Sequence, residues 1–530
     1  MTSTTTTLDL VDTDPAELAV DALVIGVHSQ DQPDADQAAA DGTPGTTPAL
    51  LLATGAESIA VAFEGRLTEA LSLLGATGAA GEVIKLATLG TVGPPLLVAV
   101  GLGPEPTGAA PAPETLRRAT GAAVRALAGT SRVAVALPVP DDADGPAALR
   151  AVAEGALLGS YRFAGYKTRP QPGRRAPVAS IALHVTDAAD PAVQAEVARA
   201  EAVAAAVIAC RDWVNTPPNE LRPPAFADSV RDTAVAAGLT VQVLDEQALI
   251  DGGYGGILAV GGGSAAPPRL VIVSYTPPEA APDAPRVALV GKGITFDTGG
   301  VSIKPAQGMW EMKSDMAGAA AVGAAMLAIA ALRPSVPVTA YLPMAENMPS
   351  GTAYRPGDVV TMFDGKRVEV LNTDAEGRMV LADAMARACA DGCDYLLETS
   401  TLTGGQVVAL GKRMAGVMGS DELCARVRAG GDAVGEPAWP MPLPDDVRKG
   451  MESEVADICQ VNSAMDRAGH MLQGGVFLRE FVSEGVAWAH LDVAGPAYHA
   501  GEPFGYWSKG GTGVPVRTLV HLVQDIAANG

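Results

Sequence analysis

Short runs of apolar residues alternate with longer segments of helical periodicity along the first third of the chain. The runs are rich in Val, Leu and Ile, and they lie at 21–29, 94–103, 131–139 and 178–185. Such alternation is typical of the strands and helices of an α/β fold. We therefore predict a smaller amino-terminal α/β domain at 1–188, with a solvated loop of turn formers and acids at 30–48.

A long helical pattern at 191–214 ends at the proline-rich segment NTPPNELRPP, which predicts a connecting helix and joint at 189–216. Beyond it, strand-like runs return at 239–246, 269–277, 286–293, 336–344, 367–372 and 393–405. Helical segments separate several of these runs, so we predict a larger domain at 217–530 with a mostly parallel sheet covered by helices. Ligands of such sheets bind outside the carboxyl ends of the strands.

The overall composition excludes several classes of protein. A formal net charge of −23 disfavours a nucleic-acid partner, because phosphate binding needs clustered Lys and Arg. The acidic start MTSTTTTLDLVDTDPAEL lacks the basic region and apolar run of a signal peptide. The apolar stretch 317–332 is short for a bilayer crossing and predicts a buried helix. We therefore expect a cytoplasmic protein with no membrane partner, whose five cysteines are reduced and mostly buried.

Two polar clusters follow predicted strands of the larger domain. The first, GKGITFDTGGVSIKPAQGMWEMKSDMAG, contains Lys292, Asp297, Lys304 and Asp315. The second, NTDAEGRMVLADAMARA, contains Asp374, Glu376 and Arg378, with the two carboxylates expected on one side of an extended segment. Gly377 is expected to let the chain turn into the helix that follows. Both clusters therefore lie where a ligand of this sheet is expected.

Each of these residues also has an ordinary structural interpretation. Asp315 is a candidate helix cap, Asp374 and Glu376 fit a solvated turn, and Lys292 and Lys304 fit surface lysines. Together, however, the carboxylates would repel one another in a cleft unless cations held them, which favours a divalent metal pair. The six histidines form no HExxH spacing. Oxygen ligands suit manganese or magnesium, and zinc also accepts carboxylates, so the metal stays open.

The segment NTDAEGR resembles the signature of the leucyl aminopeptidases, also called cytosol aminopeptidases. The segments GKGITFDTGGVSIKP, ENMPSGTAYRPGDVV, STLTGG, WAHLDVAGPA and NTPPNELRPPAFA are similar to that family as well, and the resemblance covers about 211–520. It implies hydrolysis of amino-terminal residues from peptides, with leucine and other apolar residues preferred. It also implies two divalent metal ions per chain, manganese or zinc, and a homohexamer.

The same resemblance assigns roles to individual residues. One metal ion would be held by Lys292, Asp297, Asp315 and Glu376, and the other by Asp297, Asp374 and Glu376. Lys292 must then be neutral, although the ordinary pKa of lysine is about 10.4. Lys304 would face the oxyanion of the tetrahedral intermediate, and Arg378 would hold a bicarbonate that shuttles protons. Substrate contacts are expected at Met312, Asn372, Thr401, Leu402, Gly404, Ala494 and Ala497.

Rival functions fit the chain less well. GQVVALGKR and GLGPEP do not complete a P-loop or a GxGxxG motif, and no GxSxG motif is present for a serine hydrolase. A DNA-binding accessory protein of the same fold, without enzymatic activity, is the alternative from another class, and the net charge argues against it. The chain departs from the family near the substrate pocket: Gly405 stands where the family usually has Ala, and GHMLQGGVFL is bulkier than expected.

Overall fold

The computed structural model describes residues 6–30, 50–169, 173–279 and 281–530. The chain divides into two compact units. The first comprises Met1–Ala204 with Gly501–Ser508, and the second comprises Ala205–Ala500 with Lys509–Gly530. The predicted domain limits, 1–188, 189–216 and 217–530, stay predictions, and the predicted loop at 30–48 lies almost entirely outside the described residues.

The first unit is built on a seven-stranded sheet in the order β1-β7-β6-β2-β5-β4, with β3 paired to β2. Its strands are β1 (Thr7–Val11), β2 (Ala22–Ser29), β3 (Leu50–Leu52), β4 (Val83–Ala87), β5 (Leu96–Pro104), β6 (Arg132–Ala136) and β7 (Ser180–His184). The four central pairings are parallel, whereas β3 and β4 pair antiparallel. All four strands predicted in this unit are present, and the α/β interpretation of it is confirmed.

Helices cover both faces of this sheet. They are η1 (Pro15–Glu17), α2 (Glu57–Ala62), α3 (Leu67–Leu73), α4 (Pro113–Ala126), α5 (Gly145–Ser160) and α6 (Pro191–Asn215). Leu116 of α4 and Val152 of α5 pack in one hydrophobic cluster, and Ile59 of α2 and Leu71 of α3 pack in another. α6 begins and ends within a residue of its prediction, because Pro191 suits a helix start and the Pro217–Pro218 pair stops the helix.

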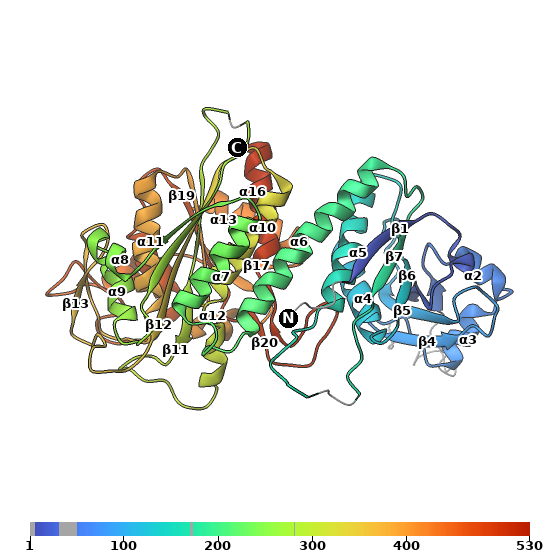
Figure 1. Ribbon diagram of the computed structural model, residues 1–530, viewed down its shortest axis with the longest axis horizontal. Coiled ribbons are helices and arrows are strands. Elements are labelled where there is room, and N and C mark those ends of the chain that lie inside the picture. Colours follow the sequence, from blue (N-terminus) through green and yellow to red (C-terminus); the bar gives the residue numbers. More distant parts are fainter. Residues whose placement is uncertain (1–5, 31–49, 170–172, 280) are drawn as a thin grey trace, which may run out of the picture. The chain divides into compact units, whose positions relative to one another are not determined.

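The second unit holds a nine-stranded sheet in the order β17-β16-β19-β15-β10-β12-β9-β8, with β11 paired to β12 (Figure 1). Its strands are β8 (Thr240–Leu244), β9 (Arg269–Tyr275), β10 (Val287–Gly291), β11 (Gly293–Asp297), β12 (Val338–Asn347), β15 (Tyr395–Ser400), β16 (Ala415–Gly419), β17 (Ala438–Pro440) and β19 (Ala487–Asp492). The pairings among β19, β15, β10 and β12 are parallel. The predicted mostly parallel sheet is therefore confirmed, with antiparallel pairs toward its edges.

The helices of this unit lie on both faces of its sheet (Figure 1). They are α7 (Pro223–Ala236), α8 (Glu246–Gly252), α9 (Gly255–Gly261), η2 (Met309–Ser314), α10 (Ala317–Leu332), α11 (Gly377–Asp391), α12 (Gly404–Leu410), α13 (Asp421–Val434), α14 (Asp445–Lys449), α15 (His470–Arg479) and α16 (Val516–Asn529). In Figure 1, α8, α9 and α11 lie on one side of the sheet, and α7, α10, α13 and α16 lie on the other. The sheet is thus enclosed by apolar helix faces and opens at its strand ends.

The apolar stretch at 317–332 is α10, as predicted. Met309–Leu332 is long and apolar enough to cross a membrane, but 78% of its most apolar window is buried inside the protein. Small residues such as Gly318, Ala319 and Ala320 let α10 lie close to the sheet. The helix is therefore part of the core, and its amino-terminal end lies beside the carboxyl ends of β10 and β15.

One strand prediction for this sheet was wrong, and one of its inner strands was missed. The run at 367–372 forms only a short strand, β14 (Arg367–Glu369), in a separate sheet with β13 (Val359–Thr361) and β18 (Ile458–Cys459). β14 therefore does not extend the main sheet, because its neighbours come from a hairpin and from a distant segment. The central strand β19 was not predicted, although it pairs with β15 over six residues. A fourth sheet joins β20 (Tyr498–His499) to β21 (Gly510–Gly511).

All five cysteines are free thiols, as predicted. Cys210, Cys424 and Cys459 are buried, whereas Cys389 and Cys393 are half-buried near the end of α11. Burial raises the pKa of Cys424 to about 11, so this thiol is not ionised at neutral pH. Cys210 and Cys424 therefore act as small apolar side chains, whereas the Cys459 thiol donates to Glu369 Oε2 and to the Glu452 carbonyl oxygen at 3.4 Å.

Candidate metal centre

Lys292 lies at the break between β10 and β11, deep in the second unit. Its side chain is 2% exposed, and its Nζ lies 2.8 Å from Asp315 Oδ2, 2.9 Å from Glu376 Oε1 and 3.1 Å from the carbonyl oxygen of Thr401. A surface role for Lys292 is therefore excluded. A buried lysine with carboxylate neighbours on two sides is a feature of functional sites.

Gly377 makes room for this lysine. A Cβ atom at position 377 would lie 2.4 Å from Lys292 Cε and 2.7 Å from Lys292 Nζ. Gly377 is the first residue of α11. The chain enters the helix at Gly377, as predicted, and the position needs a glycine because the lysine side chain crosses the helix start.

Asp297, the last residue of β11, marks the second half of the cluster. Its Oδ2 lies 2.7 Å from Lys304 Nζ, which also lies 2.5 Å from Asp374 Oδ1. The other oxygen of Asp297 accepts hydrogen bonds from the Gly299 amide and the Asn347 side chain, each at 2.8 Å. The side chain of Lys304 is 22% exposed, so this lysine lies on the accessible side of the cluster.

Asp315 and Glu376 enter the cluster from the starts of two helices. Asp315 ends η2 just before α10, and it accepts a hydrogen bond from the Thr401 hydroxyl at 2.8 Å. It makes no capping hydrogen bond to α10, so the cap interpretation is not supported. Glu376 is the N-cap residue of α11 with helical backbone angles, and Asp374 lies in a turn. The predicted extended segment is thus wrong, yet both carboxylates still face the lysines.

The cluster holds more negative than positive groups in a buried place. Burial raises the pKa of Asp297 and raises that of Asp315 strongly, and both effects exceed the opposing pull of the lysines. Burial also raises the pKa of Asp374 to about 6, against the opposing charge of Lys304. Burial alone would lower the pKa values of Lys292 and Lys304, but the surrounding carboxylates raise both. The site therefore demands positive charge.

The residues present fit metal ions. Asp297, Asp374 and Glu376 each offer an oxygen, and these oxygens lie within 4.8 Å of one another. Glu376 is only 2% exposed, and its Oε2 is buried without a hydrogen-bond partner. An unpaired carboxylate oxygen in such a place is costly unless a cation binds it. The oxygen-rich donor set suits manganese, magnesium or zinc.

Arg378 is the second residue of α11 and is 1% exposed. It donates a hydrogen bond through Nη1 to the carbonyl oxygen of Gln460, and its guanidinium lies 6.0 Å from the centre of the Phe477 ring. Burial lowers its pKa to about 10, with Glu376 and Asp492 opposing that shift. Its Nε has no hydrogen-bond partner, which leaves a buried donor available for an anion.

Some of the predicted substrate-contact residues touch the lysine and carboxylate cluster directly, whereas for others the described part of the chain shows no such contact. Thr401 contacts Asp315 and Lys292 directly, and Asn372 accepts a hydrogen bond from the Asp374 amide at 3.0 Å. Leu402 and Ala494 are half-buried neighbours, because both of their amides donate to Asp492 Oδ1. The remaining three are half-buried Met312 on η2, exposed Gly404 at the start of α12 and Ala497, which is 1% exposed.

Comparison with known proteins decides the family. The model of the cytosol aminopeptidase family, catalytic domain, matches residues 208–520, and that of the amino-terminal domain of the same family matches residues 47–170. The chain belongs to the cytosol aminopeptidase family. It is therefore a metallo-aminopeptidase, an enzyme that hydrolyses peptide bonds. The family membership indicated by NTDAEGR is therefore confirmed, and the alternative of a protein without enzymatic activity is set aside.

Similar proteins support this assignment over nearly the whole chain. A probable cytosol aminopeptidase of Streptomyces coelicolor is 50% identical, with 96% of this chain and 97% of the relative covered. One of Rhodococcus jostii is 49% identical, with 96% of each covered. Among solved structures, a tomato leucine aminopeptidase mutant has a TM-score of 0.83 and 30% identity, with 99% of this chain and 97% of that chain covered. The bottromycin maturation enzyme BotP in complex with Mn has a TM-score of 0.80 and 36% identity, with 96% and 100% covered.

Three residues that hold the aminopeptidase site were not predicted. Asn347, at the end of β12, fixes Asp297 and also donates to the Thr373 carbonyl at 3.0 Å. Gln460 is fully buried, and its Oε1 accepts from the amides of residues 371 and 372 at 2.8 and 2.9 Å. Asp492 holds the start of the segment after β15. A polar residue closing an apolar strand was the available signal for Asn347 and Asp492, whereas Gln460 carries no such signal.

Proposed function

We propose that the enzyme releases amino-terminal residues, with leucine and other apolar residues preferred, using two divalent metal ions per chain. Lys292, Asp297, Asp315 and Glu376 would hold one ion, and Asp297, Asp374 and Glu376 the other. The observation that carries this proposal is the division of the carboxylates between two ammonium groups. Lys292 joins Asp315 to Glu376, and Lys304 joins Asp297 to Asp374.

The different surroundings of the two lysines support different roles. Lys292 has acceptor oxygens from three residues around Nζ and lies in the interior, which suits a neutral metal ligand. Lys304 lies on the side of the cluster that solvent reaches. We therefore assign Lys304 a contact with the oxyanion that develops on the scissile carbonyl. Its charge would matter chiefly in the transition state.

A divalent pair, when bound, polarises the scissile carbonyl and lowers the pKa of a water molecule. The chain itself contributes orientation and charge. Asp315, with Thr401 and the start of α10 beside it, would receive the free amine of the substrate. Arg378, with its unpaired Nε, would hold a bicarbonate that shuttles the proton. Asp492 accepts a hydrogen bond from the Leu402 amide and so fixes this segment. The carbonyl group of Leu402 would then accept a hydrogen bond from the substrate.

The pocket for the side chain of the substrate's amino-terminal residue would lie between the segment after β15 and the segment after β19. Thr401, Leu402 and Gly404 follow β15, and Ala494 and Ala497 follow β19, its parallel neighbour. These residues are small or apolar, which suits a leucine-sized side chain. Met312 on η2 would close the pocket, and Asn372 would orient Asp374.

Activity should require a free amino terminus, because the amine is assigned a place beside Asp315. We expect a leucyl peptide to be hydrolysed and its acetylated form to be essentially inert at equal concentration. Release of leucine measured by chromatography compares the two. An internal control is a peptide with leucine at the second position and a free amino-terminal glycine. Equal turnover of the free and acetylated peptides would contradict the proposed binding mode.

We also propose a homohexamer, acting in the cytoplasm on peptides. The support is family membership, since the curated relatives are named cytosol aminopeptidases. Manganese is our first choice of metal, because the relative BotP was solved with Mn. Sedimentation at moderate salt should then show one large species near six chains. A stable monomer with full activity would contradict the assembly and leave the site assignment intact.

A further inference from the structure

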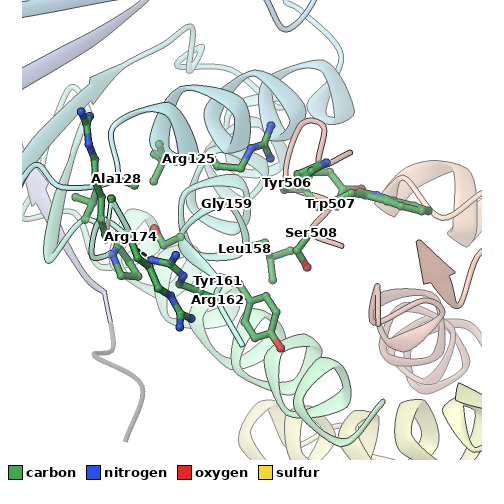
Figure 2. A pocket seen from close by; sticks show the side chains of 17 residues that line it. Arg125, Ala128, Leu158, Gly159, Tyr161, Arg162, Arg174, Tyr506, Trp507 and Ser508 are labelled. Atoms are coloured by element: carbon green, nitrogen blue, oxygen red, sulfur yellow. Dashed lines mark hydrogen bonds between the residues drawn. The ribbon is translucent and has the colours of Figure 1, made fainter. Parts of the chain in front are cut away.

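A cavity of about 430 Å³ in the first unit is lined by four arginines, Arg125, Arg162, Arg174 and Arg175 (Figure 2). Its other walls include Tyr161, Leu158 and the segment 503–508. None of the described residues that line it is acidic. In a chain with a net charge of −23, an arginine cluster without acids is not explained by general composition.

Three of the four arginines are held in place by backbone carbonyl groups. Arg125 donates to the carbonyl oxygen of Gly505, and Arg162 donates to that of Arg175. Arg174 Nη2 donates to the carbonyl oxygen of Phe163 at 3.1 Å. Across the described part of the chain, no ion pair joins any of the four lining arginines to an acid. Their charges are therefore oriented but not neutralised.

Like charges face one another in this cavity. Figure 2 shows Arg162 and Arg174 side by side, and repulsion from Arg174 adds to burial in lowering the pKa of Arg162. Burial likewise lowers the pKa of Arg125. An anion placed among these groups would relieve the repulsion and satisfy the free guanidinium donors. The volume is that of a small-molecule site.

We propose that this cavity, defined by Arg125, Arg162, Arg174 and Arg175, binds a small molecule carrying two or more phosphate groups. Guanidinium forks bind phosphate oxygens in pairs, and a terminal phosphate group brings close to two negative charges. A di- or triphosphate therefore balances several arginines within the cavity. A polycarboxylate carries one charge on each group and spreads its charge over a larger volume.

The site shares no residue with the peptidase centre, because its lining residues belong to the first unit and the proposed metal ligands belong to the second. The probe is inorganic tripolyphosphate, titrated calorimetrically into the metal-loaded enzyme at about 0.1 M salt. We expect one binding site per chain, with affinity that falls as salt rises. Binding at the metal ions would persist when the arginines are changed, so the arginine-dependent component identifies this cavity.

The test variant is the double substitution Arg162→Gln and Arg174→Gln, and the matched control is Arg66→Gln, an exposed arginine of the same unit. Tripolyphosphate should bind the double variant at least about ten-fold more weakly, while the control binds as the parent does. If the double variant fails to fold, Arg174→Gln alone, at an exposed position, takes its place. No binding to the parent, or unchanged binding to the variant, would overturn the proposal, and equally tight citrate would overturn the assignment to phosphates.

Discussion

Replacing Lys304 by alanine should lower kcat by about 10²–10³-fold while the enzyme keeps its metal ions. The expected size is that of losing one electrostatic donor to an oxyanion, about 2.7–4 kcal/mol. KM should change much less, because the contact matters chiefly in the transition state. Lys304 is partly exposed, so its loss should leave the fold intact. Steady-state kinetics and elemental analysis on the same preparation measure both quantities.

Lys292→Ala is the informative counterpart, because Lys292 lies only twelve positions away and also contacts two carboxylates. We expect this variant to lose occupancy of one ion and to recover part of its activity when metal is added. Lys449→Ala, at an exposed lysine of the same unit, is the neutral control. If Lys304→Ala loses metal while Lys292→Ala retains both ions, the two assignments are reversed.

The proposed metal ligands could be chosen from the sequence because they sit in contiguous motifs. Asp374 and Glu376 lie within one segment, and Lys292, Asp297 and Asp315 within another, so local spacing and family resemblance pointed to them together. The sequence could not predict how each one is oriented. Glu376 faces the cluster from the first turn of α11, and Gly377 is required by a lysine that is distant in sequence.

The supporting residues could not be predicted because their partners are remote. Asn347 contacts a carboxylate 50 positions earlier, and Gln460 accepts from amides 88 and 89 positions away. A single polar residue in an apolar stretch does not reveal such a partner. Their role is to satisfy buried donors and acceptors, and so to hold the ligands in one arrangement.

The pairing of strands could not be predicted either, because it also depends on residues that are remote in the sequence. The alternating run before NTDAEGR was correctly predicted to be extended, but its partners β13 and β18 placed it in a small separate sheet. β19 was missed, although it lies inside the main sheet, between β16 and β15, and carries Asp492 at its end. Periodicity identifies a strand by its local pattern, whereas its neighbours are set by contacts over long sequence distances.

Removing the metal should abolish nearly all activity, and this is the largest effect that we expect. Four carboxylates lie around two lysines, and Glu376 keeps an unpaired buried oxygen. Without cations, polarisation of the scissile carbonyl would fall to Lys304, whose ammonium group is already compensated by Asp297 and Asp374. A divalent pair supplies several kcal/mol of transition-state stabilisation, which corresponds to a loss of about 10³-fold or more. Rebinding should also raise the melting temperature, because the ions bind the folded chain.

The most direct test is hydrolysis of leucine arylamide by chelator-stripped enzyme before and after addition of manganese, zinc or magnesium, with bound metal measured in each sample. The account predicts almost no activity in the stripped enzyme and recovery that rises with occupancy to two ions per chain. Full activity in enzyme that holds no metal would contradict it.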